Sequence, residues 1–280
     1  KQPIAPGATT TLTVTLDAET LGTFDKSVYV TTNAENVARR LRFSGRVMQK
    51  VIDYDRDFAY KIGDIRLSAD HIEFDDVKKG EKPQVTLFLL NAGKKEYKPE
   101  LLHLPNYLTA KADPAVLRPG KMGKLVVTLK SNQLHGLGLT QSSVYLSRFA
   151  GDRVNKDNEL GISVTLLPNF TAAELNSPQA PLADMATSID LGAFNGKSKL
   201  KGTVVLTNKG QSPLVINMLQ VYNPGISVAL SKTTLRPGES TDMKIVVSSA
   251  VERFRGSRKV LLITNDPRHP KISLDVITKK

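Results

Sequence analysis

Short runs in which hydrophobic and polar residues alternate follow one another along this chain, separated by turns rich in Gly, Asn, Asp and Pro. Because successive side chains of a β-strand point to opposite faces, a period of two predicts strands with one buried face. Residues 125–130 and 203–208 are typical runs, and no long stretch repeats apolar residues at helical spacing. The chain is therefore predicted to be all-β.

A pattern of turns and strands occurs three times. Each copy has a Pro-Gly turn, an alternating strand, a second Gly turn, another strand and usually Thr-Asn. Gly7, Gly120 and Gly238 of the Pro-Gly turns lie 113 and 118 positions apart (120 − 7 and 238 − 120). This period is the size of one small β-sandwich and exceeds that of a solenoid repeat. The chain is thus predicted to be a tandem array of β-sandwich modules with about seven strands each.

The second and third copies also match in their internal spacing. Asn91 precedes Pro119 by 28 positions, and Asn208 precedes Pro237 by 29 (119 − 91 and 237 − 208). Such near-constant spacing indicates homologous modules. The turn at residues 91–94, Asn-Ala-Gly-Lys, is predicted to use the positive φ angles that Asn and Gly adopt readily.

Turn signals and changes in composition divide the chain into five segments. They are residues 1–48 (the C-terminal half of module 1), 49–63 (a connector), 64–167 (module 2), 168–187 (a connector rich in Pro, Ala and Ser) and 188–280 (module 3). Aromatic residues in a connector usually pack against a neighbouring module, so the first connector is expected to be more rigid than the second.

Module 1 has too few strands to close a sandwich. Three are expected, at residues 9–16, 25–31 and 39–47. We therefore expect residues upstream of Lys1, including any signal segment, to complete the module, or another chain to donate strands and form an oligomer. The apolar face to be covered consists of Leu12, Val14, Leu16, Val28, Val30, Leu41, Phe43 and Val47.

Charge and composition narrow the range of partners. The formal net charge of +12 favours an acidic partner, but basic residues are spread out with little aromatic interleaving, so nucleic-acid binding is not expected. The sequence contains no cysteine, which excludes disulfides, thiolate catalysis and cysteine-ligated metals within these residues. No apolar run approaches the roughly twenty residues needed to span a bilayer.

Candidate chemistry is sparse. Asp53, Asp55 and Asp57 have the spacing of a calcium-binding loop, but Phe58 stands where the sharp turn needs Gly, so a solvated acidic connector is the default interpretation. The four histidines show no metal-ligand spacing. Residues 135–138, His-Gly-Leu-Gly, are expected to form a hairpin turn, since no helix follows to make a phosphate-binding loop. No nucleophile elbow is present, so no enzyme activity and no cofactor are predicted.

Module 3 carries a family resemblance. The block from Pro237-Gly238 to Thr264-Asn265-Asp266-Pro267, together with the turn at residues 206–214, resembles the bacterial Ig-like domain family of unknown function 1573, related to Hydin and major sperm protein domains. Coverage is essentially the whole chain and weakest in module 2. The resemblance implies Ig-like sandwiches in an exported, cell-envelope protein that binds or scaffolds without catalysis. Members commonly carry Cys-Gly-Cys-Thr before the Pro-Gly turn, and modules 2 and 3 lack it.

Three functions remain open from the sequence. In the first, which we favour, a periplasmic or cell-surface interaction protein binds a protein partner through sheet edges or inter-module surfaces. In the second, the protein binds carbohydrate on an exposed aromatic platform, for which the candidates are Tyr54, Phe58, Tyr60, Tyr97 and Tyr107.

The third function is that of a pilus-type assembly chaperone, since such chaperones share this sandwich. They anchor a subunit carboxylate with basic residues in the cleft between two modules. In this chain a basic cleft at the first junction would draw on Arg39, Arg42 or Arg46.

Overall fold

The structure of the chain is a computed structural model that describes residues 10–16, 22–33, 38–47, 53–221, 224–253 and 258–279, apart from the side chains of Arg46, Glu252 and Arg253. The chain forms two compact units, Lys1–Asp53 and Tyr54–Lys280. The boundary between the units falls inside the segment predicted as the first connector. The second unit contains modules 2 and 3.

The first unit contains an antiparallel pair of strands, β1 (Gly22–Val30) and β2 (Arg39–Val47). Their register places Val28 opposite Leu41 and brings the rings of Phe24 and Phe43 to 6.4 Å on the same face, as the alternation predicts. Residues 10–16 form no strand, so the prediction at 9–16 is wrong in its described part. A strand requires a hydrogen-bonded neighbour, and β1 and β2 pair only with each other among the described strands. The first Pro-Gly turn lies outside the described residues.

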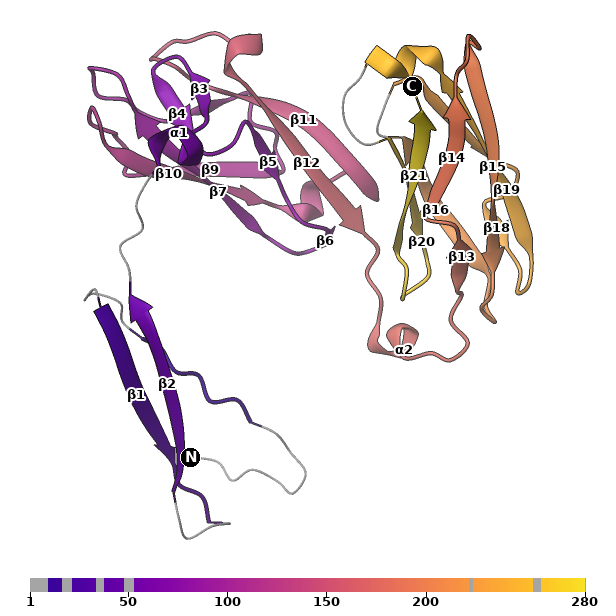
Figure 1. The fold of residues 1–280 in the computed structure, drawn as a ribbon, viewed down its shortest axis with the longest axis horizontal. Helices are drawn as coiled ribbons and strands as arrows, with labels where there is room; N and C mark the ends of the chain where they lie inside the picture. The colour runs from indigo at the N-terminus through magenta and orange to yellow at the C-terminus, as the bar shows by residue number, and fades with distance from the viewer. Residues whose placement is uncertain are drawn as a thin grey trace. The chain divides into compact units, whose positions relative to one another are not determined.

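Module 2 is a sandwich of two five-stranded sheets (Figure 1). The first has the order β3-β4-β7-β10-β9, and the second has the order β5-β12-β11-β8 with β6 paired to β12. A short helix, α1 (Tyr54–Asp57), precedes the module. The strands are β3 (Tyr60–Ile62), β4 (Ile65–Leu67), β5 (His71–Glu73), β6 (Val77–Lys78), β7 (Gln84–Asn91), β8 (Leu101–Leu102), β9 (Leu108–Asp113), β10 (Met122–Leu129), β11 (Gly138–Leu146) and β12 (Glu159–Leu167).

Module 3 repeats this architecture with sheets of the order β13-β15-β19-β17 and β14-β21-β20-β16-β18. Helix α2 (Ala172–Leu175) lies in the connector before it. The strands are β13 (Ala183–Met185), β14 (Ser188–Ala193), β15 (Lys199–Asn208), β16 (Leu214–Val221), β17 (Ile226–Leu230), β18 (Thr234–Leu235), β19 (Ser240–Ser248), β20 (Lys259–Thr264) and β21 (Lys271–Lys279). The described residues contain no helix long and apolar enough to cross a membrane.

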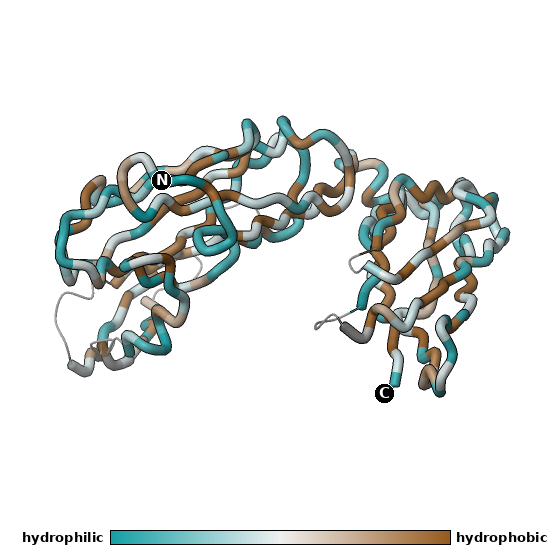
Figure 2. Tube along the Cα trace, turned by 90° about the horizontal axis from the view of Figure 1, so that it is seen from above, coloured by the Kyte–Doolittle hydropathy of each residue, from teal (hydrophilic) through white to brown (hydrophobic). Residues whose placement is uncertain are grey.

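Each module buries its own hydrophobic core between its two sheets. Figure 2 shows hydrophobic and hydrophilic residues alternating along the strands, as expected when one face of each strand is buried. In β19, for example, Met243, Ile245 and Val247 are fully buried while Lys244 is exposed. The all-β sandwich fold predicted from the period of two is confirmed.

A buried asparagine explains the repeated spacing between Asn and Pro-Gly. The Asn208 side-chain amide donates to the carbonyls of Ser212 (2.8 Å) and Leu235 (3.0 Å) and accepts from Gly210 N–H (2.9 Å). Its backbone carbonyl accepts from the N–H of Gly238, the glycine of the Pro-Gly turn (2.8 Å). The side chain thereby ties its own turn to the Pro-Gly turn about thirty residues later, which keeps the two at a fixed sequence distance.

Asn91 makes the same contacts in module 2. Its amide donates to the carbonyls of Lys95 (2.8 Å) and Leu117 (2.9 Å) and accepts from Gly93 N–H (3.0 Å). Gly93 and Asn91 do not have positive φ angles, so that part of the prediction for residues 91–94 is wrong. The turn is instead held by the Asn side chain, which takes the place of a backbone acceptor and donor.

Two connections differ from the sequence prediction. Residues 135–138 do not form a hairpin turn, because β10 and β11 belong to opposite sheets of the sandwich and do not pair. The segment crosses from one sheet to the other, starting with a 3-10 turn at Ser131–Gln133. In addition, β3 and β13 lie within the segments predicted as connectors, where each adds a short strand to the edge of a sheet.

Candidate functional site

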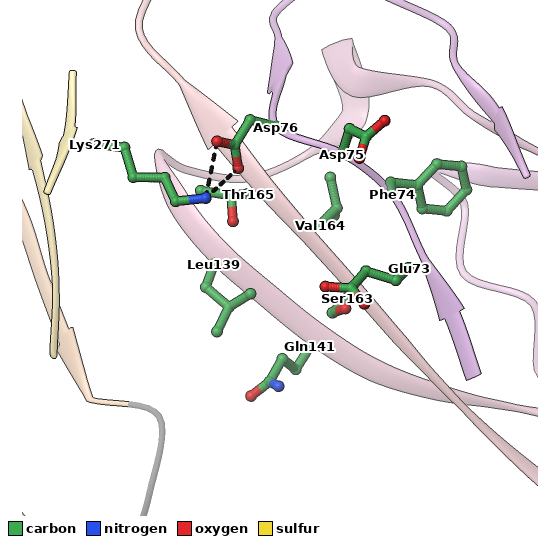
Figure 3. A pocket seen from close by; sticks show the side chains of 10 residues that line it. All are labelled: Glu73, Phe74, Asp75, Asp76, Leu139, Gln141, Ser163, Val164, Thr165 and Lys271. Carbon is green, nitrogen blue, oxygen red and sulfur yellow. Dashed lines mark hydrogen bonds and ion pairs between the residues drawn. The ribbon is translucent and has the colours of Figure 1, made fainter. Parts of the chain in front are cut away.

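A groove lies where module 2 meets β21 of module 3 (Figure 3). Strands β5, β11 and β12 supply its floor, and the turn after β5 together with Lys271 supplies a wall. The lining residues are Glu73, Phe74, Asp75, Asp76, Leu139, Gln141, Ser163, Val164, Thr165 and Lys271.

The floor of the groove is polar because strand alternation brings polar side chains to the outer face. Register places Gln141 beside Ser163 on β12, and Ser163 beside Glu73 on β5, so one row crosses three strands. Asp75 and Asp76 follow directly in the turn after β5. Lys271 is the cation of the lining, and its Nζ contacts both carboxylate oxygens of Asp76 at 2.6 and 2.8 Å. With that lysine paired, the groove has an acidic character.

A second contact between the modules lies beside the groove. Leu139 N–H donates to Gln220 Oε1 (2.7 Å), and Gln220 Nε2 donates to the Leu139 carbonyl (3.0 Å). The side-chain amide on β16 thus pairs with the backbone of β11 as a neighbouring strand would. We call this reciprocal pair, together with Lys271–Asp76, the junction latch.

Glycine is required next to the latch. Gly138 has a φ of +93°, and a Cβ at this position would lie 2.3 Å from Gln220 Oε1 and 3.2 Å from Met218 Cγ. Only a residue without a side chain lets the module 3 strand approach this closely. The sequence predicted a hairpin turn that includes Gly138, whereas in the structure Gly138 lies at the contact between the modules.

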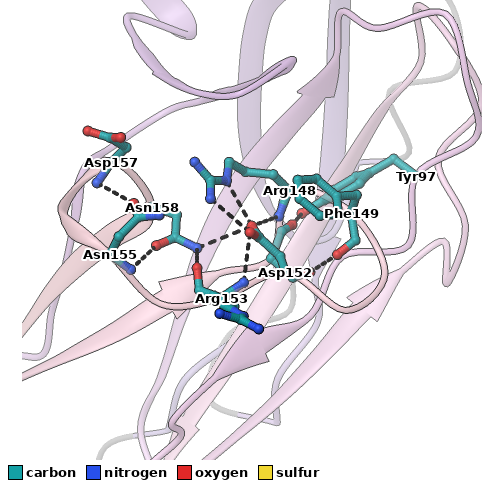
Figure 4. Close-up of polar contacts among 9 residues, drawn as sticks. Tyr97, Arg148, Phe149, Asp152, Arg153, Asn155, Asp157 and Asn158 are labelled. Carbon is teal, nitrogen blue, oxygen red and sulfur yellow. Dashed lines mark hydrogen bonds and ion pairs between the residues drawn. The ribbon is translucent and has the colours of Figure 1, made fainter.

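A buried carboxylate organises the loop between β11 and β12 (Figure 4). The Asp152 side chain is 2% exposed. It accepts from the backbone N–H, Nε and Nη2 of Arg148, each at 2.8 Å, and from Arg153 N–H (2.8 Å). The Arg148 side chain, helped by these backbone donors, holds the pKa of Asp152 far below its ordinary value. Asn158 caps the same loop by accepting from Asn155 N–H (2.9 Å). These contacts hold the loop in its conformation, so the buried carboxylate needs no functional explanation.

The predicted aromatic residues do not form a shared exposed platform. Tyr54 and Tyr60 are exposed, and Tyr54 stacks on Phe58, which is buried. Tyr97 and Tyr107 are buried, with their hydroxyl groups bonded to the Ser147 carbonyl (2.7 Å) and to Ser142 Oγ (2.7 Å). Burial, reinforced by Asp152 and Glu100, raises the pKa of Tyr97. The carbohydrate interpretation thereby loses its main support.

The three aspartates of the predicted calcium loop have other contacts or positions. Asp55 on helix α1 pairs with Arg66 on β4 (2.8 Å). Asp57 pairs with Arg56 of the same helix (3.3 Å). Asp53 belongs to the first unit, while Asp55 and Asp57 belong to the second. Within the described ranges no three His, Cys, Asp or Glu side chains are grouped in a way that could hold a metal ion.

The three arginines proposed for a basic cleft are not brought together on one face. Arg42 forms an ion pair with Asp25 on the polar face of the β1–β2 pair. Arg39 lies at an odd number of residues from Arg42, so alternation directs it to the opposite face. The Arg46 side chain lies outside the part of the chain that the structure describes.

The residues of the junction latch were not predicted from the sequence. Gln220 and Leu139 are 81 positions apart, and Lys271 and Asp76 are 195 apart. The one local signal was Gly138, a glycine at the first position of a strand, which marks a bulge or a close approach of another chain segment.

Two family profiles match the chain. Residues 181–277, which cover module 3, match the HYDIN/CFA65/VesB-like Ig-like domain. Residues 1–47 match the protein family of unknown function DUF1573. No curated protein matches the sequence.

Several solved structures are similar to the chain. A protein of unknown function from Porphyromonas gingivalis W83 aligns with a TM-score of 0.62 and 21% identity over 78% of this chain and 100% of its own. The periplasmic chaperone SfaE aligns with a TM-score of 0.30 and 13% identity over 77% of this chain and 100% of its own. The Vibrio cholerae VesB protease aligns with a TM-score of 0.31 and 13% identity over 63% of this chain and 64% of its own.

The first of these structures shares the fold. The two family matches lie at opposite ends of the chain, in module 1 and in module 3, and both were anticipated from the Pro-Gly and Thr-Asn-Asp-Pro patterns. They confirm the resemblance to the DUF1573 family and to Hydin-type Ig-like domains.

Proposed function

We propose that this chain is a non-catalytic interaction protein of the bacterial cell envelope that binds a protein partner through surfaces of its Ig-like modules. The observation that carries the proposal is the junction latch, which joins modules 2 and 3 into one compact unit with a polar, acidic groove at their contact. Docked modules present a larger continuous surface than either sandwich alone, which suits protein recognition. The lining of the groove includes no histidine or cysteine and no Ser paired with a base.

The two alternative functions receive less support. A chaperone cleft that anchors a subunit carboxylate needs a free cation, and Lys271 in the groove is already paired with Asp76 in an acidic surrounding. A carbohydrate platform needs exposed aromatic faces, and three of the five candidate aromatics are buried. Export to the envelope remains part of the proposal and follows from the family resemblance.

Affinity capture with the full 280-residue chain tests the proposal. The chain is immobilised and incubated with a bacterial envelope fraction, and bound proteins and polysaccharides are quantified. We expect one protein to be enriched and to form a stoichiometric complex when purified and mixed with the chain. Gln220→Ala removes the reciprocal pair of the latch, and Gln211→Ala is the matched control in an exposed turn. Recovery of polysaccharide without protein, or of nothing, would contradict the proposal.

A further inference from the structure

Strand β17 of module 3 forms an open sheet edge with none of the usual protection. It is the last strand of the sheet β13-β15-β19-β17, and its sequence, Ile-Ser-Val-Ala-Leu, contains no charge and no proline. Its pairing with β19 runs from Ile226 to Leu230 without a bulge. Natural sheets usually block such an edge with charged residues, prolines, bulges or very short strands.

The backbone of β17 has groups that point outward. Ser248 N–H donates to the Gly225 carbonyl (2.8 Å), and Ser231 N–H donates to the Asp242 carbonyl, so odd-numbered residues of β17 bond to β19. In an antiparallel ladder the alternate residues then direct their N–H and C=O groups away from the partner. Those residues are Ile226, Val228 and Leu230, and within the described chain no hydrogen bond is found for these groups. An added strand would find both donors and acceptors there.

The equivalent edge of module 2 is protected. Strand β9 occupies the same position beside β10 that β17 occupies beside β19. It carries Lys111 and Asp113 on its exposed face, and Asp113 pairs with Lys124 of β10 (3.2 Å). Because one module folds with a charged edge, the uncharged edge of the other is not a requirement of the fold.

The outer face next to β17 is basic. Lys199 and Lys201 on β15 and Lys244 on β19 are exposed on this face, and none has an ion-pair partner among the described residues. Asp242 is the carboxylate on the same stretch of β19. Ser227 and Ala229, the residues of β17 on this face, are small and leave Lys244 accessible from the edge. Like charges on neighbouring strands repel one another and disfavour folding, so an acidic partner bound at this face would reduce the repulsion.

We propose that β17 is the docking edge for an extended segment of a partner protein in which acidic and apolar residues alternate, added as an extra strand. This inference rests on the proposed function and names the surface and the partner chemistry. Side chains of the added strand on the outer face lie about 10 Å from the Lys244 backbone, within reach of its side chain, and favour Glu or Asp. Side chains on the other face continue the row of Ile226, Val228 and Leu230 and favour apolar residues.

Binding of a defined peptide tests the proposal. The probe is a fluorescein-labelled, end-blocked peptide of alternating Glu and Val, and its counterpart replaces each Glu by Lys. Anisotropy titrations use the full chain. We expect the acidic probe to bind at least about tenfold more tightly than the basic one at low salt.

Variants locate the site. Val228→Pro removes one outward N–H without breaking the ladder to β19 and is expected to weaken binding about fivefold to tenfold. Ala110→Pro makes the same change at an outward position of β9 and is expected to leave the affinity within about twofold. Lys244→Ser, a surface change that keeps the fold, is expected to weaken binding about threefold.

The outcomes separate this inference from the proposed function. Equal binding of both probes, no binding, or equal loss in Val228→Pro and Ala110→Pro would overturn the assignment of β17. A dimer of the chain that Val228→Pro dissociates would also overturn it, because a second copy would then occupy the edge. If the envelope partner is captured undiminished by Val228→Pro, the proposed function stands and this inference fails. If the acidic probe binds at β17 but no envelope protein is captured, the proposed function fails by itself.

Discussion

Replacing Gln220 by Ala removes the reciprocal part of the junction latch and should let modules 2 and 3 separate. The substitution deletes an acceptor for Leu139 N–H and a donor to the Leu139 carbonyl. Gln220 is partly buried and lies on β16, outside the fully buried core of module 3. The fold of each module should therefore survive the change.

The magnitude follows from the two hydrogen bonds. Each neutral hydrogen bond contributes a net ~0.5–1.5 kcal/mol, so their loss should cost about 2 kcal/mol of docking free energy. That change lowers the ratio of docked to undocked molecules about 30-fold. The Lys271–Asp76 pair is about one-third exposed on both sides and adds at most ~1 kcal/mol, so it cannot hold the junction alone.

Hydrogen exchange at the Leu139 amide reports the pair directly. We expect exchange at this amide to accelerate at least about tenfold in Gln220→Ala and to remain unchanged in Gln211→Ala. The chain has no cysteine, so engineered cysteines at Lys121 and Ser231 can be labelled alone for distance measurements by fluorescence energy transfer. A broader distance distribution in Gln220→Ala is expected. An unchanged amide rate and an unchanged distribution would refute the reasoning.

Three further predictions follow from the described contacts. Asn208→Ala leaves two carbonyls and two N–H groups, those of Leu182 and Gly210, without their side-chain partner. It should lower the free energy of unfolding of module 3 by about 3 kcal/mol, measured by urea denaturation with module 2 as the internal reference. Because the pKa of Asp152 is lowered in the folded state, the ionised side chain stabilises the protein at neutral pH, and this contribution is lost as pH falls below about 4. The difference in melting temperature between wild type and Asp152→Asn should therefore shrink on acidification. A difference that stays constant would contradict the pairing of Asp152 with Arg148. Lys271→Ser should loosen the junction by no more than about fivefold at low salt and have no effect in about 1 M NaCl, as judged by the same energy-transfer distances.

The strands could be predicted from the sequence because local alternation determines which face is buried. The run at 203–208 falls within β15, and the run at 125–130 falls within β10 except for its last residue; in both strands alternation and burial agree. The constant spacing between Asn and Pro-Gly could also be recognised in the sequence, since the backbone of Asn208 is hydrogen-bonded directly to the turn at Gly238 and Glu239. The cause of this spacing could not be predicted from the sequence, because Asn can hold a turn either through its backbone φ angle or through its side chain.

Connections and contacts between modules could not be predicted. A Gly-rich segment after a strand is compatible with a hairpin and with a crossing between sheets, and only the pairing of β10 and β11 with other strands decides between them. The latch joins positions far apart in the sequence, and neither Gln220 nor Lys271 stands in a pattern that differs from other polar residues of a strand. The alternating pattern of a strand is the same whether its outward residues face solvent or contact another module.

Comparison of the two complete modules separates features that the fold needs from features that it does not. The buried Asn and the Pro-Gly turn occur in both modules with the same hydrogen bonds, so stability explains them. The edge strands of the corresponding sheets differ. Strand β9 carries charged residues, one of which forms an ion pair, whereas β17 is uncharged and lies beside lysines that have no ion-pair partner among the described residues. Since module 2 shows that the sandwich folds with a protected edge, the exposed edge of module 3 calls for an explanation other than folding. Docking of a partner strand at β17 provides this explanation. The open edge is then the feature through which two similar modules would acquire different functions.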